Sequence, residues 1–465
     1  MHCNRFQQMT SRRDFLRRAG AGAGWLGLAG VLQQTGLFGA ETSQLGHFPA
    51  KVNSVIWLFM RGGQSAMDTF HPKPDLTKFD GKKYSGEVDA FFGEAGPLMK
   101  SPFAFAQHGQ SGAWFCEHYK ELAKHADSLS FLHGCHVESN NHTPALLQMN
   151  SGIVRPGFPS AGSWANYGLG SINNDLPGYV VFFDPRGAPE GTTVAGSGFL
   201  PSRYEATILR PTATPILHLG TPPGVSRESQ RGQLDYLAQL NSSHLASRSE
   251  DPALLGRIES FELAYRMQMT APEAVDLKKE SNATRTLYGL EADHTRAFGT
   301  QCLMARRLVE RGVRFVQLYH GGGDADTWDA HGDLNANHTN RIRETDAPIA
   351  GLLTDLKQRG LLESTLVICG GEFGRLPVSQ GTGRDHNPHG FSLWMTGGGI
   401  KPGISHGATD ELGHKAVEGR VSIHDLHATL LHLLGLDHTR LTYSHNGRRY
   451  RLTDVAGELV KAILA

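Results

Sequence analysis

A short apolar run that ends in glycines and a carboxylate gives the strongest indication of the fold. Residues 365–369 (Thr-Leu-Val-Ile-Cys) have the composition of a buried strand, and two glycines and Glu372 follow directly. Open α/β sheets bind their ligands at the carboxyl edge of the strands. This strand would therefore place the Glu372 carboxylate where ligands bind. A polar turn in which Glu372 pairs with Arg375 is the structural alternative.

A glycine-flanked segment after this strand adds two more donor groups. Residues 383–387 have the sequence Gly-Arg-Asp-His-Asn, so we expect Asp385 and His386 to come from a loop. Oxygen and imidazole donors together suit zinc, manganese or iron better than calcium. The sequence therefore predicts a divalent metal site, with zinc as first choice and manganese, iron and calcium as alternatives.

Two more apolar runs end in a similar way. Residues 313–319 are rich in β-branched and aromatic side chains and lead into glycines, with Asp329 and His331 beyond them. In an extended segment these two alternate residues would point the same way. Residues 52–60 lead into two glycines and then Asp68. Because all three strand ends carry Asp, Glu or His, we expect Asp68, Asp329 and His331 to be metal ligands as well.

The segment between a predicted strand (129–133) and a predicted helix (143–149) presents a helix N-terminus. Free backbone N–H groups and the helix dipole favour an anion at such a position. We therefore expect His142 or Thr143 to meet a phosphate or sulfate group. A structural role is equally compatible with the sequence, with Asn141 or Thr143 capping the helix.

Strand-like and helix-like segments alternate along the chain, which favours an α/β fold with a mostly parallel central sheet flanked by helices. Strands are expected at residues 52–60, 129–133, 178–183, 313–319, 365–369 and 391–396. Helices are expected at 114–126, 143–149, 231–240, 252–269, 294–311, 347–359, 423–434 and 455–464. Few strand signals occur from about residue 230 to 311, so we expect an internal helical region within a domain that spans 48–465.

The first 40 residues have the pattern of a twin-arginine export signal. Arg12 and Arg13 precede a glycine- and alanine-rich apolar stretch, residues 19–32, which is too short to be a good membrane span. We therefore expect a periplasmic or otherwise exported protein with no membrane span in the mature chain. The 45 Lys and Arg residues balance the 45 Asp and Glu residues, which gives no case for a nucleic-acid partner.

These motifs together resemble the bacterial DUF1501 family, which is similar to the alkaline phosphatase/sulfatase superfamily. The matching segments are 62–70 (GGQSAMDTF), 328–332 (WDAHG), 371–375 (GEFGR) and 383–386 (GRDH), with 159–164 (PSAGSW) and 176–178 (LPG) also typical. The resemblance covers nearly the whole chain after the signal. It implies a parallel sheet with metal ligands at the strand ends and a nucleophile at a helix N-terminus.

The resemblance also implies roles for the metal-binding candidates. Asp68 matches the first-strand metal aspartate of the superfamily, and Asp329 and His331 match its later Asp and His ligands. Glu372 and His386 occupy positions where the superfamily has further ligands. The resemblance thus implies the same metal site that the strand ends predict.

The reacting groups follow from the same comparison. His142 falls at the nucleophile position with Thr143 beside it, so one of the two would be nucleophile or general base. Arg375 or Arg384 would hold an anionic group bidentately, and Asn141 would assist in binding the substrate.

Two hypotheses about function follow. The first is an exported metal-dependent hydrolase of phosphate or sulfate esters, with an anionic small molecule or glycan as substrate. The alternative is a non-catalytic relative that binds sulfated or phosphorylated glycans in the cell envelope. The chain lacks the Cys-x-Pro-x-Arg or Ser-x-Pro-x-Arg motif and has Leu146 where the arginine is expected, which favours the alternative. The several carboxylate–imidazole pairs favour the enzyme.

Overall fold

The computed structural model describes residues 46–465 except 92, 189–192, 213, 218, 222, 247–251 and 324–325. The predicted export signal, residues 1–40, lies outside the described residues. Gly46–Ala465 pack as one unit. Within the described part of the chain, no helix is long and apolar enough to cross a membrane.

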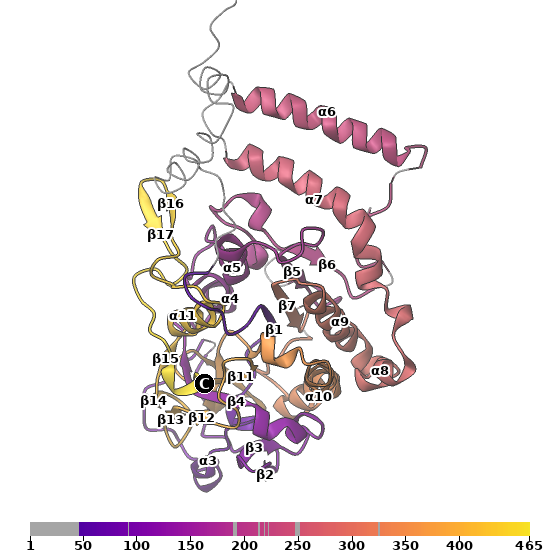
Figure 1. The fold of residues 1–465 in the computed structure, drawn as a ribbon. Coiled ribbons are helices and arrows are strands. Elements are labelled where there is room, and N and C mark those ends of the chain that lie inside the picture. Colours follow the sequence, from indigo (N-terminus) through magenta and orange to yellow (C-terminus); the bar gives the residue numbers. More distant parts are fainter. Residues whose placement is uncertain are drawn as a thin grey trace, which may run out of the picture. The chain divides into compact units, whose positions relative to one another are not determined.

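A nine-stranded sheet forms the centre of this unit (Figure 1). The strand order is β12-β4-β11-β8-β1-β7-β5-β6, with β15 also paired to β4. The strands are β1 (Ser54–Met60), β4 (Ser130–His136), β5 (Tyr179–Phe182), β6 (Thr207–Leu209), β7 (Phe315–His320), β8 (Thr365–Gly370), β11 (Phe391–Gly397), β12 (Ser405–His406) and β15 (Val421–Ser422). Every pairing is parallel except those of β11 with β4 and β8. The prediction of a mostly parallel α/β sheet is confirmed.

The register of the central strands brings their carboxyl ends to one level. Met60 of β1 lies opposite His320 of β7, and Phe59 lies opposite Gly370 of β8. Because these strands are parallel, the chain leaves all three at the same edge of the sheet. The segments that carry the predicted site residues therefore begin next to one another in space.

Helices cover both faces of the sheet (Figure 1). Residues 55, 57 and 59 of β1 belong to the apolar cluster of α4 (His142–Ser151), α5 (Ala161–Leu169) and α11 (Ile423–Leu433). Residues 56, 58 and 60 belong to the cluster of α9 (Asp293–Glu310) and α10 (Leu334–Gln358). Strand side chains alternate between the two faces, so β1 contributes to both clusters and is buried throughout.

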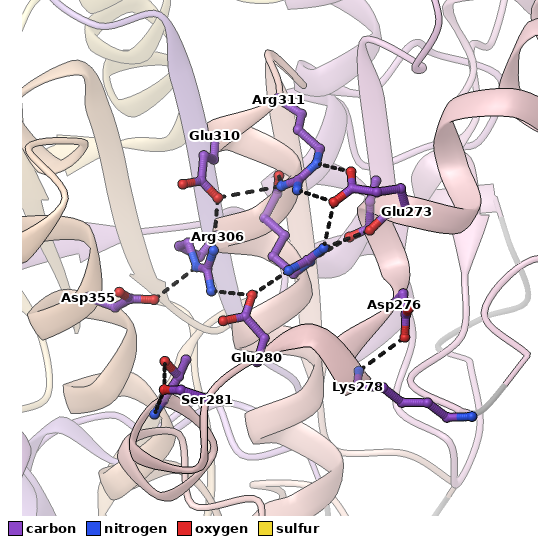
Figure 2. Close-up of polar contacts among 12 residues, drawn as sticks. Glu273, Asp276, Lys278, Glu280, Ser281, Arg306, Glu310, Arg311 and Asp355 are labelled. Atoms are coloured by element: carbon purple, nitrogen blue, oxygen red, sulfur yellow. Dashed lines mark hydrogen bonds and ion pairs between the residues drawn. The ribbon is translucent and has the colours of Figure 1, made fainter.

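The region near residues 230–311 is helical and comprises α6 (Arg227–Ala246), α7 (Pro252–Val275), α8 (Asn282–Leu287) and α9. A network of ion pairs fastens the segment after α7 to α9 and α10 (Figure 2). Arg306, buried on α9, lies 2.7 Å from Glu280 and 2.9 Å from Asp355. Arg311 lies 2.9 Å from Glu273 of α7. Charge pairing thus complements the apolar packing of these helices.

The remaining elements are short. They are α3 (Pro74–Lys78) and the antiparallel pairs β2 (Phe105–His108) with β3 (Ala113–Cys116), β9 (Gly374–Gln380) with β10 (Gly383–Asn387), β13 (Ala408–Thr409) with β14 (Ala416–Glu418), and β16 (Tyr443–His445) with β17 (Arg448–Tyr450). Short 3-10 helices include Ala66–Asp68, Leu122–Ser128 and Lys461–Ile463. The β9–β10 hairpin carries part of the candidate site.

Two of the predicted helices are wrong. Residues 114–116 end strand β3, because their backbone pairs with β2, and only a 3-10 helix (Leu122–Ser128) follows. Residues 455–464 contain only a short 3-10 helix. The backbone there bonds to another segment, since the N–H of Lys401 donates to the carbonyl of Ile463 at 2.8 Å.

The expected loop around Asp385 and His386 is also wrong. Both residues lie on strand β10, where His386 pairs with Arg375 of β9. The polar composition of this strand concealed it, because strand patterns depend on apolar alternation.

Candidate metal centre

Side chains from four parts of the chain gather at the carboxyl edge of the sheet. They are Asp329 and His331 after β7, Glu372 after β8, Asp385 and His386 on β10, and His142 at the start of α4. Two sets of three have donor atoms within 4.8 Å of one another: His142 with Asp329 and His386, and His331 with Asp385 and His386. The three-dimensional fold thus brings most of the predicted ligands together.

His142 is held between two carboxylates. Its Nδ1 lies 2.6 Å from Oε1 of Glu372, and its Nε2 lies 3.2 Å from Oδ2 of Asp329. Burial alone would lower the pKa of His142, but the contacts with Asp329 and Glu372 outweigh it and raise the pKa to about 9. The Gly62 N–H donates to both oxygens of the buried Glu372, at 2.9 and 3.1 Å. The end of β1 therefore holds Glu372, and Glu372 holds His142.

Asp329 contacts four side chains of the centre. Its Oδ1 lies 2.7 Å from Nη1 of Arg375, 3.0 Å from Nε2 of His331 and 3.2 Å from Nε2 of His386. Its Oδ2 faces His142. Burial would raise the pKa of Asp329, but the Arg375 charge and the imidazoles outweigh it and hold the pKa far below the ordinary value. Asp329 is therefore an ionised oxygen donor surrounded by imidazole nitrogens.

His331 and His386 approach each other with their Nε2 atoms 2.9 Å apart. Nδ1 of His386 donates to the carbonyl of Asn140 at 2.6 Å, which leaves Nε2 as the atom with a lone pair. Nδ1 of His331 contacts Oε1 of Gln380 and lies 3.7 Å from Oδ1 of Asp385. Burial lowers the pKa of His386 to about 4, so this ring is neutral at pH 7. An imidazole held through one nitrogen presents the other to a metal.

Two phenylalanine rings pack against the imidazoles. The Phe373 ring centroid lies 4.8 Å from that of His142 and 4.6 Å from that of His386, and the Phe91 ring lies 5.1 Å from His386. The Phe91 N–H donates to Oδ2 of Asp385 at 2.7 Å. Sequence patterns did not identify these contacts, because Phe91 belongs to an irregular segment remote in the chain. Phe373 did carry a signal, since it adjoins Glu372 in the GEFGR motif.

The centre is open to solvent on one side. The side chains of His142, Asp329 and His331 are 24%, 24% and 26% exposed, whereas His386 is 1% and Asp385 4% exposed. Buried donors therefore lie beneath partly exposed ones. An outside ligand can reach the centre from the exposed side.

Asp68 and Arg384 lie apart from this centre and pair with each other. Oδ2 of Asp68 lies 2.7 Å from Nε of Arg384, and neither side chain is exposed. The hydroxyl of Ser65 donates to the same Asp68 oxygen. The remaining guanidinium N–H groups of Arg384 donate to the carbonyls of Leu376, Pro377 and Met99. The geometry therefore supports neither Asp68 as a metal ligand nor Arg384 as an anion-binding group, since a buried ion pair uses both.

Arg375 is buried beside Asp329, and its guanidinium group also makes contacts within the protein. It is buried and donates to the carbonyls of Gly63 at 2.8 Å, Arg384 at 3.1 Å and Gly62. Its Nη1 faces Asp329. These contacts orient Asp329 and connect the ends of β1 and β9. They do not support the predicted role of Arg375 in holding a substrate anion.

Asn141 caps α4, as the structural alternative predicted. Its Oδ1 accepts from the N–H of Thr143 at 3.1 Å, and its carbonyl accepts from the N–H of Ala145 at 3.1 Å. Pro144 has no N–H to offer. The first turn of α4 therefore keeps its dipole but has little donor capacity for an anion. The Asn141 side chain serves the helix, which does not support its predicted role in substrate binding.

The protein is therefore an α/β protein with a carboxylate–imidazole centre at the carboxyl edge of a mostly parallel sheet. Residues 52–464 match the family described as "Protein of unknown function (DUF1501)", and the chain belongs to this family. The family resemblance predicted from the motifs is confirmed. A comparison with curated proteins gave no match.

Solved structures with a distant likeness include three hydrolases. A sulfatase from Pseudoalteromonas sp. has 12% identity and a TM-score of 0.35, over 83% of this chain and 68% of that chain. Alkaline phosphatase from the Antarctic bacterium TAB5 has 11% identity and a TM-score of 0.33, over 78% and 96%. The phosphonate monoester hydrolase from Silicibacter pomeroyi has 13% identity and a TM-score of 0.34, over 68% of each chain. At these values the likeness carries no argument about activity.

Proposed function

We propose that the protein is a metal-dependent hydrolase of phosphate or sulfate esters. The observation that supports this proposal is the convergence of His142, Asp329, His331, Asp385 and His386 at the open edge of the sheet. Neutral imidazole and carboxylate oxygen together are the donors that zinc prefers, with manganese and iron as alternatives. Gathering several polar groups away from water costs free energy, and a bound cation would compensate for that cost.

The residues fit a divalent metal in one specific respect. Nε2 of His142 is buried and faces Oδ2 of Asp329 at 3.2 Å, so a nitrogen and an oxygen donor lie close together. A metal bound here would replace the proton on Nε2, since a ligating imidazole gives up the proton on the nitrogen that binds. Asp329 and His386 would complete the set of three, with His331 and Asp385 beside them. When bound, the metal would polarise the ester oxygen and stabilise the charge that develops during hydrolysis.

The chain's own residues would hold and shape this site. Glu372 contacts and orients His142, and Arg375 contacts and orients Asp329. Phe91 and Phe373 cover part of the imidazole cluster with apolar surface. Arg375 and Arg384 are both consumed by internal contacts, so positive charge for an anionic substrate would come from the metal and the α4 dipole.

An anionic small molecule or glycan outside the cytoplasm is the proposed substrate class. The exported location follows from the Arg12-Arg13 signal pattern and is part of the same proposal. A second candidate function is a non-catalytic protein that binds sulfated or phosphorylated glycans. One observation favours it: both ring nitrogens of His142, at the expected nucleophile position, face carboxylates.

Metal analysis combined with an ester screen tests the proposal. Protein purified without chelators should contain at least one divalent transition metal, and it should hydrolyse an aryl phosphate or aryl sulfate. A chelator should abolish turnover, and zinc or manganese should restore it. His386→Ala should lose metal and activity together, whereas His108→Ala, at the end of β2 and outside the centre, should retain both.

The outcomes separate the two candidate functions. Metal without turnover, together with tight binding of a sulfated glycan, would favour the non-catalytic protein. A protein that takes up no metal even after incubation with zinc would contradict both the cofactor and the hydrolase.

A further inference from the structure

We propose that Glu372 is a positioning residue that makes His142 a metal ligand, so that the first residue of α4 supplies a ligand and not a nucleophile. This inference rests on the metal-dependent centre proposed above. It reverses the roles that the sequence suggested, in which Glu372 was a ligand and His142 a reacting group.

The position of the proton on His142 follows from its contact with Glu372. A carboxylate only accepts hydrogen bonds, so Nδ1 of His142, 2.6 Å from Oε1 of Glu372, carries a hydrogen. Nε2 faces Oδ2 of Asp329 at 3.2 Å and is then the nitrogen that would exchange its proton for a metal. This atom is buried, and His142 forms one of the two sets of clustered donors with Asp329 and His386. A carboxylate behind an imidazole is a common way to orient a metal-binding histidine and raise its basicity.

Glu372 itself is poorly placed to be a ligand. It is fully buried and belongs to neither set of clustered donors. Both of its oxygens accept from the N–H of Gly62, and Oε1 also accepts from His142. These contacts form a second layer: the end of β1 holds Glu372, and Glu372 holds the ring.

A second carboxylate–histidine pair in the same protein shows the difference. Nε2 of His320, the last residue of β7, lies 2.9 Å from Oε2 of Glu344. The other nitrogen of His320 accepts from the indole N–H of Trp328 at 3.0 Å. Both nitrogens of His320 are therefore used within the protein, which makes this ring structural. His142 has the same carboxylate support, but its second nitrogen faces Asp329, which is itself one of the clustered donors.

Glu372→Gln tests the positioning role. Glutamine keeps the size of the side chain and an acceptor for Gly62, but it removes the charge behind His142. The apparent Kd for zinc, measured in competition with a chromogenic chelator, should rise about 10- to 100-fold, as is usual for outer-layer partners of metal ligands. Glu344→Gln is the matched control and should bind zinc like the wild type. Thermal unfolding of both variants checks that they are folded.

The ligand role of His142 has its own readout. X-ray absorption of the zinc-loaded protein should show one imidazole ligand fewer in His142→Ala than in the wild type. An unchanged imidazole count in His142→Ala, or wild-type zinc affinity in Glu372→Gln, would overturn the inference while leaving the hydrolase standing. Failure of the wild type to bind zinc would instead remove the proposed function itself.

Discussion

Replacing Asp68 by asparagine separates the structural role that we assign to this residue from a role in metal binding. Asp68 contacts Nε of Arg384 at 2.7 Å and Nη2 at 3.2 Å, and both side chains are fully buried. Burial alone would raise the pKa of Asp68, but the Arg384 charge outweighs it and lowers the pKa. Asparagine would leave the Arg384 guanidinium buried without its counter-charge.

The expected loss of stability follows from this burial. Removing one partner of a buried ion pair costs about 3–5 kcal/mol, because the other charge is left uncompensated. An unfolding entropy of about 2.1 cal/mol/K per residue gives about 0.9 kcal/mol/K for a unit of roughly 420 residues. The Asp68→Asn variant should therefore melt about 3–6 °C below the wild type.

Differential scanning calorimetry and zinc analysis together provide the assay. Asp68→Asn should show the lower Tm and an unchanged zinc content. The double variant Asp68→Leu with Arg384→Met should recover much of the stability, because no charge remains buried. Asp80→Asn removes a partly exposed pair with Lys100 at 3.4 Å and should leave the Tm nearly unchanged. A variant Asp68→Asn that melts like the wild type but loses zinc would refute this reasoning and restore Asp68 as a ligand.

Three further predictions concern the centre, the core and export. A Cβ at Gly383 would lie 2.1 Å from the carbonyl oxygen of Ala330, which separates Asp329 from His331. Gly383→Ala should therefore displace these two side chains and weaken zinc binding about tenfold or more. Gly332→Ala, whose Cβ meets no atom within 4 Å, should bind like the wild type. Burial lowers the pKa of His427 to about 3, so the unfolded chain binds this proton below about pH 6.5 while the folded protein does not. The free energy of unfolding should therefore fall with decreasing pH between about 6.5 and 3. In His427→Gln, denaturant titrations at several pH values should show a weaker dependence of this free energy on pH. Replacing both arginines of the Arg12-Arg13 pair by lysine should retain the protein in the cytoplasm, as fractionation would show, and normal delivery would contradict the signal assignment.

Local patterns along the chain were sufficient for the main elements of the sheet. The apolar runs of β1, β7 and β8 lie at the predicted places, because a buried parallel strand is apolar on both faces and its sequence shows this directly. The helix N-terminus at His142 was visible for a similar reason, since capping depends on residues close together in sequence. Strand β10 was not visible, because its residues are polar and their burial depends on partners elsewhere in the chain.

The order of residues along the chain was enough to bring Asp329, His331, Glu372 and His386 to the carboxyl edge. They follow predicted strands, and parallel strands deliver the segments after them to one edge of the sheet. The role that each group takes at this edge depends on packing between distant parts of the chain. Asp68 and Arg384 are chemically suitable for the centre, yet they neutralise each other in the interior, because a buried charge must be paired. Which of several suitable side chains becomes a ligand, a support or an ion-pair partner depends on contacts between residues far apart in the chain. Local sequence patterns carry no information about those distances.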